Sequence, residues 1–215
     1  MSEVGLRTVA GVAMIFTALT AEWFGGTVFA VFVAAAATVM YYEWSRMVRG
    51  WGLGWNVAGF FYALVPALAL LWIRERGGSP AGSRGFELVL WAFIVTWAAD
   101  IGAFFAGRTF GGPKLAPTIS PNKTISGLIG GVIAATLLGG LWANASHLTW
   151  PWYVFAPLFA VAAAGGDLFE SWLKRKAGVK DAGALIPGHG GALDRLDGLV
   201  PVAVLTGGLV LAGLT

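Results

Sequence analysis

Long apolar stretches separated by shorter polar segments make up most of the chain. A helix needs roughly 20 mostly apolar residues to cross a bilayer, with about 17 as the lower limit. The stretches lack the strict apolar–polar alternation of a membrane β-barrel strand. Seven candidate spans follow from this pattern: 8–24, 27–42, 55–73, 88–105, 127–146, 150–169 and 199–214, of which the first, second and seventh are short. We therefore expect an all-α fold, a polytopic transmembrane helical bundle with about seven spans.

The composition is that of a membrane protein and not of a soluble domain. Hydrophobic residues make up 57% of the chain and charged residues 12%, and the mean hydropathy is +0.74. No cysteine is present, which excludes disulfides and thiolate metal sites. We expect one integral membrane domain over 1–215, with N-terminal spans at about 8–73 and a catalytic part at about 88–215. Polar loops at 106–126 and 171–198 carry the candidate chemistry.

Counting spans places both loops on the side of the N-terminus, as a single active site requires. The basic residues of that side are Arg7, Arg46, Arg49, Arg108, Lys114, Lys123, Lys174, Arg175, Lys176, Lys180 and Arg195, against only Arg74, Arg76 and Arg84 on the other. An excess of Lys and Arg marks the cytoplasmic side. We therefore predict a protein of the bacterial inner (plasma) membrane with a cytoplasmic N-terminus and active site.

Two further classes of feature are not expected. Basic residues beside membrane spans account for the pI near 9.5, so no nucleic-acid partner is predicted. Glu22 and Trp23 end the first apolar run, where a signal peptide would have small residues at its cleavage site. We therefore expect no cleavable signal peptide.

Three aspartates stand out between residues 166 and 198. On a helix, Asp167, Ser171 and Lys174 recur at intervals of four and three and share one face. Asp194 and Asp197 are three apart, so on a helix both carboxylates point the same way and repel unless a cation lies between them. Oxygen-only ligands favour a hard ion such as Mg²⁺. The alternatives are an ion pair of Asp167 with a basic neighbour at a helix end and aspartates that complement the dipole of the last helix.

The glycine-rich turn PGHGG, residues 187–191, can bring backbone N–H groups close to phosphate oxygens. It is not a P-loop, because the Gly-Lys-Ser/Thr ending is missing. His189 can donate to a phosphate or transfer a proton, although a lone loop histidine is more often structural. The cations suited to a polyphosphate are Lys174, Arg175, Lys180 and Arg195. Their alternative role is to lie beside lipid headgroups.

The earlier loop adds a second polar group. Asp100 lies inside the fourth span, two turns before Arg108, which indicates either a buried ion pair or a polar site at the cytoplasmic mouth of the bundle. Ser120, Lys123 and Thr124 precede an apolar helix, as helix caps do, and also suit an anion at a helix N-terminus. The mixed charges together indicate a site for a strongly anionic ligand at the lipid interface.

The pattern Ser171, Lys174-Arg175, Lys180-Asp181, Pro187, His189-Gly190-Gly191 and Asp194-Arg195-Leu196-Asp197 resembles the signature of the phosphatidate cytidylyltransferase family, the CDP-diacylglycerol synthases. The segments ADIGAFFAGRTFG and ISPNKT also resemble that family, so the resemblance covers most of the chain from the third span onward. It implies Mg²⁺-dependent transfer of CMP from CTP to phosphatidate, giving CDP-diacylglycerol and pyrophosphate. It also implies a homodimer, and it leaves open a second, monovalent cation.

The resemblance assigns roles to individual residues. The expected catalytic residues are Asp167, Asp194, Asp197, Lys174, Arg175 and His189, with the three aspartates as metal ligands. The expected substrate-binding residues are Ser120, Lys123, Ser171, Lys180, Asp181, Gly190, Gly191, Arg195, Asp100 and Arg108. The chain departs from the family pattern at Ser126, where members usually carry Glu, and in its length, which leaves out spans between the second and the third.

Two other functions fit parts of the pattern. A CTP-dependent prenyl-lipid cytidylyltransferase or polyprenol kinase would keep the fold and change the lipid. A transporter would use Asp100 and Asp167 to line a pathway, and it would show discontinuous helices in corresponding halves. No internal repeat is found, and the polar groups cluster at one face, so the sequence favours the enzyme.

Overall fold

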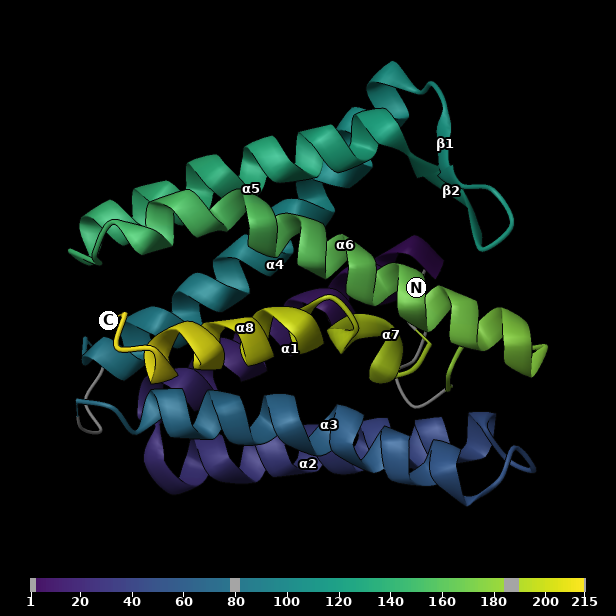
Figure 1. Ribbon diagram of the computed structural model, residues 1–215, viewed down its shortest axis with the longest axis horizontal. Coiled ribbons are helices and arrows are strands. Elements are labelled where there is room, and N and C mark those ends of the chain that lie inside the picture. Colours follow the sequence, from purple (N-terminus) through teal and green to yellow (C-terminus); the bar gives the residue numbers. More distant parts are fainter. Residues whose placement is uncertain (1–2, 78–81, 184–189, 215) are drawn as a thin grey trace.

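The computed structural model describes residues 3–77, 82–183 and 190–214, and helices make up nearly all of it (Figure 1). The elements in chain order are α1 Glu3–Phe24, α2 Gly26–Met47, α3 Leu53–Arg74, α4 Arg84–Phe110, β1 Lys114–Ala116, β2 Ser120–Thr124, α5 Ile125–Ala145, α6 Pro151–Ala177, α7 Leu193–Leu196 and α8 Leu199–Leu211. Each of the seven predicted apolar stretches corresponds to one long helix, α1 to α6 and α8.

Five of the described helices, α2 to α6, are long and apolar enough to cross a membrane. The apolar part of α1, Val9–Phe24, and α8 are shorter. α8 has 13 residues, about 20 Å at 1.5 Å per residue, whereas the hydrocarbon core of a bilayer is about 30 Å thick. An all-α membrane bundle therefore fits the fold, but the predicted count of about seven complete spans is not confirmed.

The polar segments gather at one end of the bundle. The β1–β2 hairpin, the C-terminal end of α6 and α7 lie toward that end, while the α5–α6 connection lies at the other (Figure 1). Arg175 near the end of α6 donates from Nε to the backbone oxygen of Ile119, between the two strands, at 3.2 Å. The two polar loops that the span count predicted on one face are thus in contact.

The antiparallel pair of β1 and β2 occupies a segment that was expected to be an irregular loop. The sequence of β2 does not predict a strand, because it contains Pro and Asn, which are depleted in strands. Thr124 then caps α5 by accepting from the N–H of Gly127 at 3.0 Å, as predicted. Ser126, at the position where the family usually has Glu, donates to the backbone oxygen of Gly111. It therefore ties the start of α5 to the end of α4.

Small residues let α4 and α5 pack backbone against backbone, as membrane helices often do. A side-chain carbon built on Gly131 would lie 2.6 Å from the carbonyl oxygen of Ala99, and one on Gly102 would lie 2.6 Å from that of Gly130. The pairing fixes the part of α4 that carries Asp100 relative to α5 and to the hairpin before it.

A buried ion pair joins α1 and α3 at the end of the bundle away from the hairpin. Arg74 Nε lies 2.9 Å from Glu22 Oε1, with both side chains at most 1% exposed. Arg74 Nη2 also donates to the backbone oxygen of Glu22 at 2.9 Å. Gly25 follows with a φ of 61°, and a side chain there would collide with the Arg74 guanidinium. The pair therefore fixes the α1–α2 turn against the end of α3.

The α4–α5 packing predicts opposite outcomes for two glycines of α5. Gly131→Ala forces a methyl against the Ala99 carbonyl and should lower the free energy of unfolding by about 1–3 kcal/mol. Gly140→Ala is the control, because its nearest neighbour would be Tyr153 at 3.9 Å, and the loss of glycine flexibility should stabilise it by about 0.5–1 kcal/mol. Unfolding of both variants in the same detergent measures the difference. Equal stabilities would contradict the packing.

Candidate active site

Three carboxylates from separate parts of the chain form what we call the carboxylate cluster: Asp100, Asp167 and Asp197. α4 supplies Asp100, α6 supplies Asp167, and Asp197 lies between α7 and α8. The charges of both other members act on Asp197. Gly166 makes this approach possible, because a side chain there would collide with the backbone oxygen of Asp197. Like charges that act on one another are stabilised by a neighbouring cation.

Two cations predicted from the sequence lie beside the cluster. Lys123 on β2 forms an ion pair with Asp167 on α6, so the hairpin brings the two motif-bearing loops together at this point. The charges of Lys123 and Arg195 both act on Asp100. The cluster therefore combines acidic and basic groups from four separate elements.

The electrostatics of the cluster suit an added cation. Burial raises the pKa of Asp197 to about 8, and the charge of Asp167 adds to the rise, although Asp197 also accepts from the backbone N–H of Gly198. A cation would stabilise the charged form, and oxygen-only ligands suit Mg²⁺. Among the described residues, however, no three His, Asp or Glu side chains are arranged to hold a metal ion. The donor chemistry fits Mg²⁺, and the metal site stays a prediction.

A second charged group, the buried triad, consists of Glu170 and Lys174 on α6 and Asp194 on α7. Lys174 Nζ is 2.6 Å from Glu170 Oε2 and 2.6 Å from Asp194 Oδ1. The side chains of Glu170 and Asp194 are 1% and 7% exposed. The single positive charge of Lys174 is therefore shared between two buried acidic side chains, and Lys174 is not an unpaired cation in this structure.

Asp194 Oδ2 also accepts hydrogen bonds from two backbone N–H groups, those of Ala182 at 3.0 Å and of Gly191 at 2.8 Å. Burial alone would raise the pKa of Asp194, but the neighbouring Glu170 and Lys174 side chains and the Gly191 N–H hold that pKa below its ordinary value. Asp194 and Asp197 lie in one short stretch of helical backbone, because the residues on either side of α7 are also αR. The printed contacts of the two aspartates nevertheless differ: Asp194 belongs to the triad and Asp197 to the cluster. Their predicted common direction stays a prediction.

The other predicted residues lie around these two groups. Ser171 Oγ is 3.5 Å from Asp167 Oδ1, so the predicted common face of α6 is present. Ser120 begins β2, and Gly190 has a φ of 80°, which favours glycine. Lys180 and Asp181 are exposed beyond the end of α6. His189 and Pro187 lie outside the described residues.

The predicted alternatives based on simple ion pairs are wrong. Within the described part of the chain, Asp100 forms no ion pair with Arg108, whose guanidinium carbon lies 6.0 Å from the ring centre of Phe104. Asp167 pairs with Lys123 and not with a basic residue of its own helix. Asp167 is therefore joined to the hairpin and not to a cation of its own helix.

Sequence reasoning missed three residues of this region. Glu170 was overlooked although its spacing of four from Lys174 is a helical pairing signal. Glu43 on α2 is buried and accepts backbone N–H groups from residues 192 and 193, which no local pattern reveals. Among the residues that the structure describes, the buried hydroxyl of Tyr62 on α3 has no hydrogen-bond partner. The ring of Tyr62 lies 5.6 Å from that of Phe169, centre to centre.

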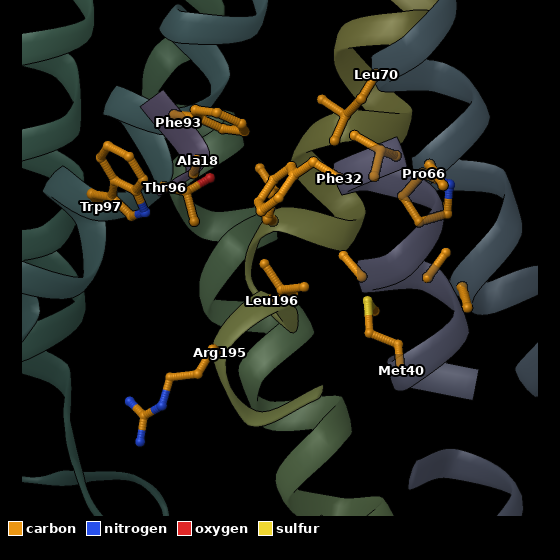
Figure 2. Close-up of a pocket in the computed structure, with 16 residues that line it drawn as sticks. Ala18, Phe32, Met40, Pro66, Leu70, Phe93, Thr96, Trp97, Arg195 and Leu196 are labelled. Atoms are coloured by element: carbon orange, nitrogen blue, oxygen red, sulfur yellow. The ribbon is translucent and has the colours of Figure 1, made fainter. Parts of the chain in front are cut away.

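Figure 2 shows an apolar cavity whose lining includes Leu196, the residue before Asp197 in the carboxylate cluster. It holds about 700 Å³ of space, including its open mouth, and is lined by residues of α1 to α4 together with Arg195, Leu196 and Leu199. Figure 2 shows Phe32 and Leu196 among the lining side chains, with Arg195 at one end and its guanidinium pointing away from them. Thr96, one turn before Asp100, also lines it. An apolar space thus ends at a charged site.

Comparison with known proteins decides the family. Residues 54–211 match the model of the cytidylyltransferase family, which is more than half of the chain. The chain belongs to the cytidylyltransferase family. It is 37% identical to the phosphatidate cytidylyltransferase of Brucella suis biovar 1, in an alignment that covers 95% of this chain and 92% of that protein.

Other members of the cytidylyltransferase family are also similar. The phosphatidate cytidylyltransferase of Rickettsia bellii is 31% identical, over 98% of this chain and 93% of its own length. That of Haemophilus influenzae is 43% identical over 65% of this chain and 51% of its own length. The Brucella alignment extends over 254 positions, more than the 215 residues of the chain. That relative therefore contains segments that this chain lacks, in agreement with the predicted shortness.

The buried triad predicts a large loss of stability on removal of its cation. Lys174→Met leaves two buried carboxylates without their partner and should cost about 3–5 kcal/mol of unfolding free energy. Adding Glu170→Gln removes one of the charges and should recover part of the loss. Lys176→Met is the matched control: this exposed lysine contacts tryptophan rings, the nearest of them 4.4 Å away, which contributes about 0.5–1 kcal/mol. Equal losses for the two lysines in detergent unfolding would rule out the triad.

Proposed function

We propose that this protein is a phosphatidate cytidylyltransferase, which forms CDP-diacylglycerol and pyrophosphate from CTP and phosphatidate. The observation that carries the proposal is an apolar cavity whose lining includes Arg195 and the neighbours in sequence of the carboxylate cluster. Such a site can receive a polar nucleotide and a lipid together. The names of the relatives support the same reaction.

The chemistry requires two anions to meet. A phosphate oxygen of phosphatidate attacks the α-phosphorus of CTP, the new P–O bond forms, and the bond from the α-phosphorus to the β-phosphate oxygen breaks, so that pyrophosphate leaves. The lipid phosphate is largely ionised near neutral pH, so it needs no strong base and no protein nucleophile. Lys123, Arg175 and Arg195 would neutralise the phosphates, and the rate comes mainly from positioning and charge stabilisation.

The proposed cofactor is Mg²⁺ at the carboxylate cluster. Asp167 and Asp197 are its first ligands in this proposal, with Asp100 beside them. Asp194, which the family motif would add, is held by Lys174 in the buried triad and would have to exchange that partner to reach the ion. When bound, Mg²⁺ would neutralise phosphate charge and make the α-phosphorus more electrophilic.

The apolar cavity is proposed to hold an acyl chain of the lipid. Its lining on α2 extends from Met40 to Phe32, eight residues or about 12 Å at 1.5 Å per residue. One leaflet contributes about 15 Å of hydrocarbon, so the cavity matches the depth of a single leaflet. Arg195 at its end would lie near the lipid phosphate.

The proposed setting is the inner membrane of a bacterium, with the hairpin end on the cytoplasmic side where CTP is present. The excess of Lys and Arg on that side supports this orientation. The family resemblance adds a homodimer to the proposal. Size determination of the detergent-solubilised protein by light scattering, with the detergent contribution subtracted, tests the dimer.

Removing a cluster carboxylate should abolish the reaction. Purified Asp167→Asn and Asp197→Asn, incubated with labelled CTP, phosphatidate and Mg²⁺, should form labelled lipid at least about 100-fold more slowly than wild type, because charge stabilisation by a single group is commonly worth about that much. Glu75→Gln, an exposed carboxylate beyond the other end of α3, is the control and should be fully active. Full activity in either aspartate variant would refute the metal assignment.

Narrowing the cavity should change the preference for lipid chain length. Ala36 lines the cavity, and Ala36→Phe should raise the KM for long-chain phosphatidate about tenfold while short-chain phosphatidate is used as before, since losing two or so buried methylenes is worth roughly 1.5 kcal/mol. Ala35→Phe, on the exposed side of the same helix, is the control. A uniform effect on both lipids, or the same effect of the control, would exclude the cavity as the acyl site.

Two experiments separate the proposed reaction from its competitors. Turnover of a prenyl-type phosphate or an ether-linked analogue in preference to phosphatidate would favour the related prenyl-lipid enzymes. Solute flux into liposomes without any consumption of CTP would favour a transporter.

A further inference from the structure

Glu43 links the second helix to the far end of the chain. Its Oε2 accepts from the N–H of Leu193 at 2.8 Å, and its Oε1 accepts from the N–H of Ala192 at 3.2 Å. The side chain is 1% exposed. A carboxylate of α2 therefore holds the backbone immediately before Asp194, although the two segments are 150 residues apart in sequence.

The surroundings of this carboxylate leave no spare room. A side-chain carbon on Gly183 or on Gly191 would collide with the Glu43 carboxylate, so both glycines pack directly against it. Among the described residues Glu43 has no cationic partner, and the two N–H groups stabilise its buried charge. Because the Glu43 carboxylate accepts from two consecutive backbone N–H groups, it fixes the position of the segment that carries them.

Glu43 and Asp194 accept hydrogen bonds from neighbouring backbone N–H groups. Asp194 accepts from the N–H groups of Ala182 and Gly191, and Glu43 accepts from the next two along the chain, those of Ala192 and Leu193. Four backbone N–H groups are therefore held by two carboxylates. The short α7 that follows carries Arg195 and leads into Asp197.

We propose that Glu43 is a positioning residue for nucleotidyl transfer: it fixes residues 191–193 so that Asp194, Arg195 and Asp197 lie where the substrates need them. The inference rests on the proposed function. Glu43 precedes residues 54–211, the region that matches the family model, so the role belongs to the part of the chain outside that match. It touches no reacting atom and acts through the backbone that it holds.

The test compares three variants of the full-length protein in one detergent. Glu43→Ala removes both acceptors, and Glu43→Gln keeps one acceptor oxygen in nearly the same shape. Glu22→Gln is the control, because Glu22 is equally buried but lies at the other end of the bundle, outside the site. The kcat and the KM for each substrate are measured with labelled CTP and phosphatidate, per mole of folded protein. Hydrogen exchange at Ala192 and Leu193 is followed by mass spectrometry without substrates.

We expect Glu43→Ala to lower kcat about 10- to 100-fold, the size of effect that small misplacements of a catalytic group produce, with the KM for phosphatidate unchanged. Glu43→Gln should recover part of kcat. Exchange should accelerate at both residues 192 and 193 in Glu43→Ala, but at only one of them in Glu43→Gln, which keeps one acceptor. Wild-type kcat in Glu43→Ala, or an equal fall in Glu22→Gln, would overturn the inference. If wild type forms no CDP-diacylglycerol, the proposed function fails, whereas unchanged exchange in Glu43→Ala overturns the positioning role by itself.

Discussion

A charge buried in a membrane protein has to find its compensation inside the protein, and this constraint organises the polar end of the bundle. Lys174 forms ion pairs with two buried acidic side chains, Glu170 and Asp194. Lys123 compensates Asp167 from a hairpin on another part of the chain, and Glu43 is compensated by backbone donors. Because an uncompensated buried charge is costly, each of these contacts joins two segments that the apolar packing alone would leave free to slide. The contacts that compensate these buried charges therefore also hold the segments of the site together.

The same arrangement suits a reaction between a nucleotide and a lipid. The carboxylate cluster with its cations lies at the hairpin end, and an apolar cavity begins one helical turn away at Thr96. Water-soluble and lipid-soluble reactants can therefore reach one point without either crossing the full bilayer. The family match and this geometry come from independent observations and lead to the same chemistry.

The sequence predicted the parts of this molecule that depend on local pattern. Apolar runs identified every long helix, Thr124 was recognised as a cap, and the parity of spans brought Arg175 to the same end as the hairpin it contacts. Family motifs identified Asp167 and Lys123, but only the fold shows that these two residues pair with each other. A family motif can indicate which residues belong to a site, but the contacts between those residues are known only from the tertiary structure.

What the sequence could not predict depends on contacts between distant segments. The hairpin carries Pro and Asn, which argue against strands, so its pairing comes from the surrounding helices. Asp194 and Asp197 were expected to share one metal ion, but Asp194 pairs with Lys174 and accepts from Gly191, contacts that depend on distant segments. Glu43 has no neighbouring motif, and its partners are far away in the chain. Non-local hydrogen bonds of this kind leave no periodic signal.

The contact between Glu43 and Leu193 also has a consequence for how the protein is made. The helix bearing Glu43 leaves the ribosome 150 residues before its partner, which at about 5–20 residues per second corresponds to roughly 8–30 s. Throughout that interval the carboxylate has been synthesised without the donors that satisfy it. The hairpin end can therefore reach its final arrangement only after residues 192 and 193 have been synthesised.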